Sequence, residues 1–173
     1  MHTLHYWLVE AEDREQARAN VTDRLISDEG ESFVEWSDWH VVGGGRWSDS
    51  QYEDSSSMIV SYSEQPEKFK EVLEGIKTAR VKEMQECMSK INTDKFISNM
   101  SNYVSNNASL DVERFDMNHY YMRHALDLLT ERYSPDSYFY DLIEYTASME
   151  YIQNAIDTKN SAMLFLVPID FHF

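Results

Sequence analysis

A run of three glycines between two tryptophans constrains the fold of this chain more than any other feature. The run is Gly43-Gly44-Gly45, and it follows an apolar stretch that ends at Val42. Glycine loses more backbone entropy on folding than any other residue, so consecutive glycines indicate positions where a Cβ atom cannot be tolerated. We therefore expect a tight turn or bulge where a strand leaves its sheet, with positive φ angles or a close approach by another group. The candidate ligand-binding residues at this turn are Trp39, His40, Gly43, Gly44, Gly45, Arg46 and Trp47.

Four segments have the pattern or the composition of strands. Residues 2–10 and 163–173 show the period of two that places successive side chains on opposite faces of a sheet. Residues 33–42 and 58–62 are rich in β-branched and aromatic residues, and a polar loop over 48–57 separates them. One strand therefore lies near the start of the chain, two follow in its first half, and one closes it.

Apolar residues at helical spacing predict two helices among these strands. In the segment 12–27, Ala17, Val21 and Leu25 repeat every four residues. A longer helix is expected from Pro66 to about residue 90. Its buried side is expected to hold Phe69, Val72, Leu73, Ile76, Ala79 and Met84.

The middle of the chain, residues 92–160, is predicted to be a helical block. Helices are expected near 96–104, from residue 110 or 111 onward, and over 138–157, with a turn at 134–137. The second of these helices is expected to bury Phe115, Tyr121, Met122, Ala125, Leu126 and Leu129. Tyrosines are frequent in the block, which favours core packing or a protein-binding or self-association surface.

The order of these elements predicts an α+β fold. Without the helical block, the order is the β-α-β-β-α-β of a ferredoxin-like fold. We therefore predict a single domain over 1–173, with an antiparallel four-stranded sheet, helices on one face, and an α-helical insertion over 92–160 before the last strand. The predicted strand order is 4-1-3-2, with the last strand beside the first.

The charge of the chain limits its partners. Acidic residues outnumber basic ones by 31 to 15, which gives a net charge of −16. This charge argues against direct nucleic-acid binding and against attraction to anionic membranes, because both need a basic face. Solubility explains the charge, and so does attraction to a partner with a basic surface. The densest acidic stretch comprises Glu29, Glu31, Glu35, Asp38, Asp49, Glu53 and Asp54.

The sequence indicates a cytoplasmic protein. It holds no apolar stretch long enough to span a membrane, and its first residues lack the pattern of a signal peptide. Cys87 is the single cysteine, which excludes an intrachain disulfide and agrees with a reducing compartment.

Arg46 has two interpretations, both of which depend on its tryptophan neighbours. The glycine run lacks the spacing of phosphate-binding loops, so it gives little support to a nucleotide site. Arg46 can stack on an indole and pair with a carboxylate, which would lock the loop to the sheet. Alternatively, its guanidinium is presented to an anionic ligand.

Asp170 and His172 share one face of the last predicted strand, because residues i and i+2 point the same way. A carboxylate beside an imidazole can orient it for acid–base chemistry, although a strand that reaches solvent has the same sequence. We include both among the candidate ligand-binding residues. We assign no catalytic residue because no nucleophile motif is present, and we lean against an enzyme.

The histidines do not follow a metal-binding motif. His119 and His124 are five residues apart, so they lie on different faces of a helix. His5, His40, Asp170 and His172 form a metal site only if the sheet brings them together. Isolated histidines are the simpler interpretation, and we predict no metal and no cofactor.

The stretch Asp38–Ser48 resembles a pattern in small, uncharacterised proteins of tailed bacteriophages. In those proteins an Asp-Trp-aromatic strand leads into Gly-Gly-Arg-Trp-(Ser/Thr)-Gly, and the chain starts and ends in similar ways, here with Val167-Pro168-Ile169-Asp170-Phe171-His172. This chain differs by His40 in place of an aromatic residue, by a third glycine, and by Asp49 in place of glycine. The resemblance implies a phage-type origin and, with it, the cytosol of a host cell.

We therefore expect an acidic, non-enzymatic binding protein. Its partner would be a host or anti-phage defence protein that it modulates, contacted by the helical block and the acidic surface. The alternative is a nucleotide-binding, anion-binding or hydrolytic protein. In that case Arg46 would hold the anion, Trp39 and Trp47 would stack, and Asp170 with His172 would supply acid–base chemistry. A structural protein that assembles with itself is a third interpretation.

Overall fold

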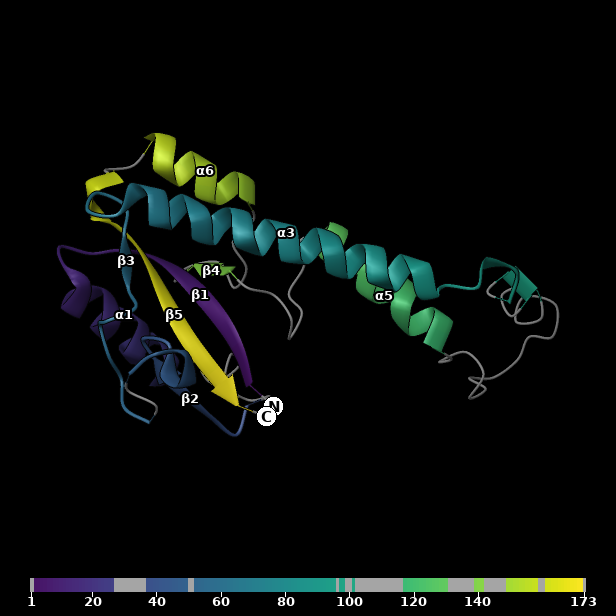
Figure 1. The fold of residues 1–173 in the computed structure, drawn as a ribbon, viewed down its shortest axis with the longest axis horizontal. Helices are drawn as coiled ribbons and strands as arrows, with labels where there is room; N and C mark the ends of the chain where they lie inside the picture. The colour runs from purple at the N-terminus through teal and green to yellow at the C-terminus, as the bar shows by residue number, and fades with distance from the viewer. Residues whose placement is uncertain are drawn as a thin grey trace. The chain divides into compact units, whose positions relative to one another are not determined.

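Two long strands from distant parts of the chain form the centre of the sheet in a computed structural model of the protein (Figure 1). Strand β1, His2–Glu10, pairs antiparallel with β5, Leu164–His172, from His2 opposite His172 to Glu10 opposite Leu164. This confirms both predicted strands and their predicted pairing. The structure describes residues 2–26, 37–49, 52–95, 97–98, 101, 117–130, 139–141, 149–158 and 161–172.

The remaining strands pair on either side of this central pair. Strands β2, Trp39–Val42, and β3, Val60–Ser61, both pair antiparallel with β5, while β4, Phe139–Asp141, pairs parallel with β1. The sheet order is β2-β5-β1-β4, with β3 also on β5. The α+β class and the four antiparallel strands are confirmed. The predicted 4-1-3-2 order is wrong, because the last strand is internal, and the ferredoxin-like topology is not confirmed.

Strand β5 is inner because it pairs with β1 on one side and with β2 and β3 on the other. Every residue of β5 except His172 is buried, so both faces of the strand are covered. A strand with one solvated face would alternate buried and exposed residues, whereas a nearly continuous apolar run is typical of a strand covered on both faces. The apolar side chains on both faces of 163–173 in the sequence are typical of a strand that is covered on both faces.

Pro168 lies within this inner strand without breaking its hydrogen bonding. The N–H and C=O of one residue in an antiparallel strand point to the same side, and Pro168 O accepts a bond from Gly43 N at 2.7 Å. That side of β5 is the gap between the end of β2, opposite Ile169, and the start of β3, opposite Leu166. Proline therefore occupies a position where no strand partner needs its missing N–H.

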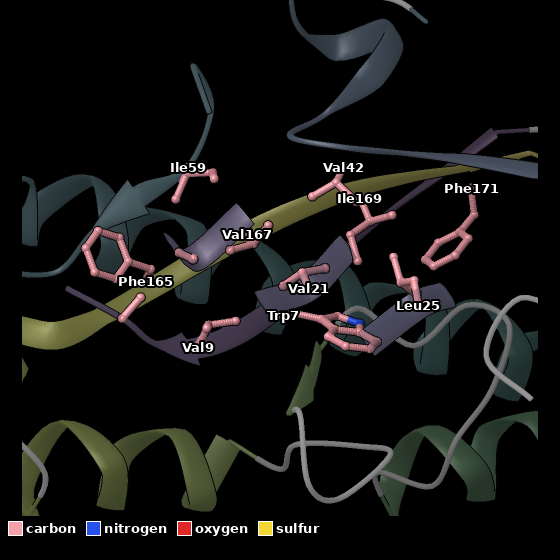
Figure 2. Packing of buried hydrophobic residues seen from close by; sticks show 12 residues of the cluster. Trp7, Val9, Val21, Leu25, Val42, Ile59, Phe165, Val167, Ile169 and Phe171 are labelled. Carbon is pink, nitrogen blue, oxygen red and sulfur yellow. The ribbon is translucent and has the colours of Figure 1, made fainter. Parts of the chain in front are cut away.

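One face of the sheet packs against helix α1, Arg14–Ile26 (Figure 2). The helix buries Ala17, Val21 and Leu25, as its spacing predicted. Aspartate at the start of the helix caps it, because Asp13 Oδ1 accepts from Gln16 N at 2.8 Å. The buried cluster is completed by Trp7, Val9, Ala11, Val42, Ile59, Phe165, Val167, Ile169 and Phe171.

The segment predicted as a helical insertion also contains a strand. Residues 139–141 form β4, so the helix predicted over 138–157 is wrong there, and α6 covers only Met149–Thr158. The aromatic run in this segment favours a strand as much as a helix, and the free edge of β1 offers it backbone partners. The helix predicted over 96–104 falls almost entirely outside the described residues, as do residues 33–36 of the second predicted strand.

Two compact units divide the chain, one of Met1–Glu74 with Pro135–Phe173 and one of Gly75–Ser134. The division falls within α3, Pro66–Lys90, and not at residue 92. In the second unit, the rest of α3 lies against α5, Met117–Leu129, through a 2.7 Å contact between Glu83 Oε1 and His124 Nε2. Ala79, Leu126 and Leu129 are exposed, so their predicted burial is wrong.

Adjacent residues at the end of α1 test the core. Leu25 is 2% exposed and its neighbour Ile26 is 72% exposed. We expect Leu25→Ala to lower the free energy of unfolding by about 2–4 kcal/mol, because it leaves a cavity between α1 and the sheet. Ile26→Ala should change it by less than about 0.5 kcal/mol. Urea denaturation of both variants measures the difference, and equal costs would contradict the described packing of α1.

Candidate functional site

The glycine run forms the turn that its sequence predicted. Gly43, Gly44 and Gly45 have φ angles of 98°, 103° and 47°, which L side chains rarely adopt. Space is also lacking: a Cβ on Gly43 would collide with the carbonyl oxygen of Ser55, and one on Gly44 would lie 2.7 Å from Met58 Sδ. Positive φ and close approach therefore act together at this turn.

The turn leads into a short 3-10 helix, Gly45–Trp47, which packs on β5 at Asp170. A Cβ on Gly45 would lie 2.5 Å from Asp170 Oδ2. The hydroxyl of Ser48 donates to Gly45 O at 2.8 Å and closes the turn. The third glycine thus allows the backbone to lie directly against a buried carboxylate.

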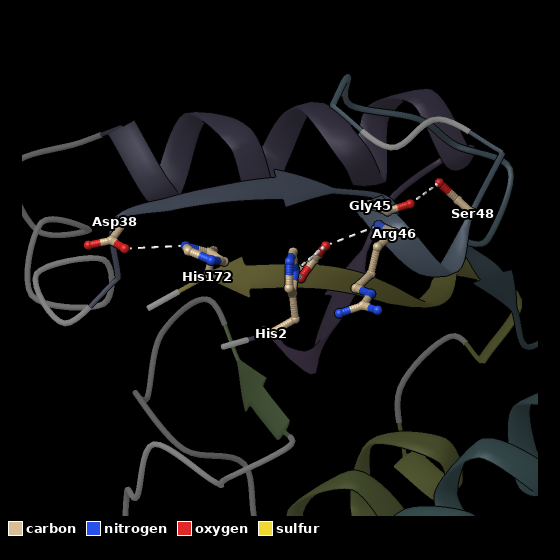
Figure 3. Close-up of polar contacts among 7 residues, drawn as sticks. His2, Asp38, Gly45, Arg46, Ser48 and His172 are labelled. Atoms are coloured by element: carbon tan, nitrogen blue, oxygen red, sulfur yellow. Dashed lines mark hydrogen bonds and ion pairs between the residues drawn. The ribbon is translucent and has the colours of Figure 1, made fainter.

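Asp170 connects three segments of the chain (Figure 3). Its side chain is 0% exposed. Oδ2 accepts from Arg46 N at 3.0 Å, and Oδ1 lies 2.9 Å from His2 Nδ1. A buried carboxylate without such partners would be strongly destabilising, so its partners are as important as its burial. The carboxylate therefore holds the glycine turn and the start of β1 against β5.

This arrangement corrects the predicted pair of Asp170 and His172. The two residues do share a face, but Asp170 contacts His2, and His172 Nδ1 lies 3.2 Å from Asp38 Oδ2. The candidate residues did not include His2, because the pattern of a single strand does not identify the residues opposite it. Had the pairing of β1 with β5 been extended to its end, it would have placed His2 opposite His172.

Aromatic rings surround the two imidazoles. Trp39 stacks on His172 with ring centroids 5.1 Å apart and planes 9° apart. The ring of His2 is edge-on to Trp39 at 5.3 Å and to His172 at 4.9 Å. The ring centroid of Trp47 lies 6.2 Å from that of His2. These contacts fix both imidazoles between β1, β2, β5 and the turn.

Arg46 does not lock the loop to the sheet with its guanidinium, because its backbone N–H makes that attachment. The side chain is exposed, and the guanidinium lies over Trp47 at 5.6 Å from the ring centroid. It makes no hydrogen bond or ion pair with any residue that the structure describes. Trp47 and Tyr52 are 43% and 77% exposed. We define the turn patch as His2, Trp39, Arg46, Trp47, Tyr52 and His172.

His40 and His5 lie on the opposite face of the sheet. Both contact Phe171, at 5.9 Å and 5.2 Å between ring centroids. The considered metal set of His5, His40, Asp170 and His172 is therefore not brought together. Within the described ranges, no group of three or more His, Cys, Asp or Glu residues could hold a metal ion.

Comparisons with protein-family models, curated proteins and solved structures find no match. The resemblance to phage proteins therefore stays a prediction. In the part of the chain that the structure describes, no helix is both long and apolar enough to cross a bilayer.

Two glycines allow a matched test of the turn. Gly43→Ala should lower the free energy of unfolding by about 3 kcal/mol or more, because it combines a positive φ with a collision against backbone. Gly75, in α3, has nothing within 4 Å of an added Cβ. Gly75→Ala should therefore raise stability by about 0.5–1 kcal/mol. Thermal unfolding measures both, and a tolerated Gly43→Ala would contradict the described turn.

Burial of His40 makes stability depend on pH. Burial lowers the pKa of His40 from its usual 6.5, against a weaker opposing effect of Asp54. The unfolded chain then binds the proton more tightly than the folded one, so the contribution of His40 is intact above about pH 6.5 and is lost as pH falls toward the lowered pKa. The Tm advantage of wild type over His40→Gln should shrink between about pH 7.5 and pH 5.5. A constant or growing advantage would contradict the burial of this ring.

Proposed function

We propose that this chain is a non-enzymatic binding protein that recognises another protein through the turn patch. The observation that carries the proposal is the exposed guanidinium of Arg46, which lies over exposed Trp47 without a carboxylate partner among the described residues. Arginine, tryptophan and tyrosine are the residue types that most often dominate binding energy at protein interfaces. The patch gathers all three, with Arg46 and Trp47 on the turn and Tyr52 beside Trp39 at 6.4 Å between ring centroids.

The hydrogen bonds of the turn support a binding role. Bonds from Arg46 N to Asp170 Oδ2, from Gly43 N to Pro168 O and from the Ser48 hydroxyl to Gly45 O order a glycine-rich backbone that would otherwise be flexible. Binding through preordered residues loses little conformational entropy, so more of the contact energy becomes affinity.

Acidic residues around the patch give the proposed interface its electrostatic character. Asp38, Asp49 and Glu53 are exposed near the turn in sequence. Glu29, Glu31 and Glu35 of the same acidic stretch lie outside the described residues. Acidic residues beside an arginine–aromatic centre fit a partner that has one acidic group for Arg46 and basic groups around that acidic group. Attraction between the acidic and basic groups would speed association in a salt-dependent way.

The identity of the partner rests on the sequence resemblance. If the likeness of Asp38–Ser48 to the phage proteins reflects common origin, the partner is a host or anti-phage defence protein in the bacterial cytosol, and this chain modulates it. The sequence also predicted a contact through the helical block. The present proposal places the contact at the turn patch instead, and the Tyr120 variant below tests this choice.

The second candidate is the binding of a small anion such as a nucleotide. Arg46 over Trp47 favours it, because a guanidinium can hold a phosphate while an exposed indole stacks on a base. The hydrolytic form of this reading has less support, since Asp170 is engaged by His2 and Arg46 N and does not pair with His172.

The test is capture of partner proteins from bacterial lysate by the immobilised chain. We expect Arg46→Ala and Trp47→Ala each to reduce the captured protein about tenfold or more, as for interface centres. Tyr120→Ala, at a 53% exposed position of α5, should leave capture unchanged. High salt should weaken capture.

Capture that is equal for all four chains would contradict the role of the turn patch, and loss only in Tyr120→Ala would assign the contact to the helical block. Tryptophan fluorescence during nucleotide titration separates the second candidate. A saturable change that Arg46→Ala removes would favour the nucleotide over a protein partner.

A further inference from the structure

We propose that His2 and His172 together bind a divalent transition-metal ion through their Nε2 atoms. The starting observation is that each imidazole has a carboxylate at the same ring nitrogen. His2 Nδ1 lies 2.9 Å from Asp170 Oδ1, and His172 Nδ1 lies 3.2 Å from Asp38 Oδ2 (Figure 3). The inference uses neither Arg46 nor Trp47, so it does not depend on the proposed protein partner.

The carboxylates determine which nitrogen is available to a metal. An ionised carboxylate can only accept a hydrogen bond, so it favours the tautomer that carries its proton on Nδ1. The lone pair of a neutral ring is then on Nε2. Histidines that bind metals in proteins almost always donate their other ring N–H to a carboxylate, a carbonyl or water, which orients the ring and makes it a better ligand. His2 has this second partner in Asp170, which is hydrogen-bonded to its Nδ1 at 2.9 Å. His172 has the Asp38 carboxylate 3.2 Å from its Nδ1 as an ion-pair neighbour, without a hydrogen bond to that nitrogen among the described residues.

The distance between the two ring centroids falls in the range for two imidazoles on one ion. With metal–nitrogen distances near 2.0–2.1 Å, the centroids of two imidazoles on one metal are separated by about 4.5 Å at a right angle and about 5.2 Å at a tetrahedral angle. The observed separation of His2 and His172 is 4.9 Å. The strand register produces this spacing directly, because the two residues are opposite each other on β1 and β5.

The surroundings leave the rings accessible and supply negative charge. The side chains of His2 and His172 are 22% and 32% exposed, while Asp170 is buried beside them. Since the described residues provide no third His, Cys, Asp or Glu ligand, water would fill the remaining positions. Imidazole ligands suit Cu²⁺, Ni²⁺ and Zn²⁺, and Cu²⁺ binds most tightly in the general affinity order.

Trp39 provides the signal for a direct test, because it stacks on His172. The whole chain, free of any histidine tag, is titrated with Cu²⁺ while tryptophan fluorescence is recorded, and with Zn²⁺ by calorimetry. We expect one saturable ion per chain. His2→Asn and His172→Asn should each weaken binding at least tenfold, because each removes one of two protein ligands. The control His119→Asn, at an exposed position of α5, should bind like wild type.

Asp38→Ala adds a test that leaves both proposed metal ligands, His2 and His172, unchanged. Its side chain is 70% exposed, so the fold should tolerate the change, and loss of the carboxylate at His172 should weaken the ion about tenfold. Unchanged affinity in the His172 variant, or loss in the His2 variant alone, would overturn the shared site. Circular dichroism of each variant shows whether a loss reflects unfolding, and the Asp38 variant decides the question if a histidine variant unfolds.

Discussion

The buried carboxylate of Asp170 is the interaction on which the rest of this site depends. It lies on the inner strand β5, with no exposure to solvent, and is held by His2 from β1 and by the backbone N–H of Arg46 from the turn. A buried charge is tolerated only when such partners replace water. The same contact explains the third glycine, because any Cβ at Gly45 would collide with this side chain.

The sequence specified the local elements better than their arrangement. Period-two patterns predicted β1 and β5, and the spacing of Ala17, Val21 and Leu25 predicted α1, because these patterns follow from the geometry of one strand or one helix. The strand order was not specified in this way. Both faces of β5 are apolar, which indicates that both faces are covered but does not say which strands lie beside it.

Most residues of the site were predicted from the sequence, but the contacts between them were not. The glycine turn, Trp39, Arg46, Trp47, Asp170 and His172 were candidates, and the strand register brings most of them to one face. His40 falls on the other face, since neighbouring residues of β2 alternate. His2 lies in the site because it is opposite His172 in the sheet. This register depends on contacts between residues far apart in sequence. The short β4 was missed because three residues carry too little pattern.

The Asp170 carboxylate connects the turn, the histidines and the proposed binding roles. Asp170 holds the backbone of Arg46, which frees the guanidinium to lie over Trp47 at the surface. It also holds Nδ1 of His2, which leaves Nε2 for another ligand. A single buried carboxylate therefore positions both Arg46 and His2 at the same end of the sheet.

The most direct test of this account is hydrogen exchange of the Arg46 backbone amide in the wild-type chain and in Asp170→Ala. The amide of Gly43, which donates to Pro168 O at 2.7 Å, serves as the internal reference. The account predicts a protected Arg46 amide in wild type and a loss of protection of about tenfold or more in the variant, as expected for a bond to a charged acceptor, while Gly43 stays protected. An Arg46 amide that exchanges equally fast in both chains would contradict it.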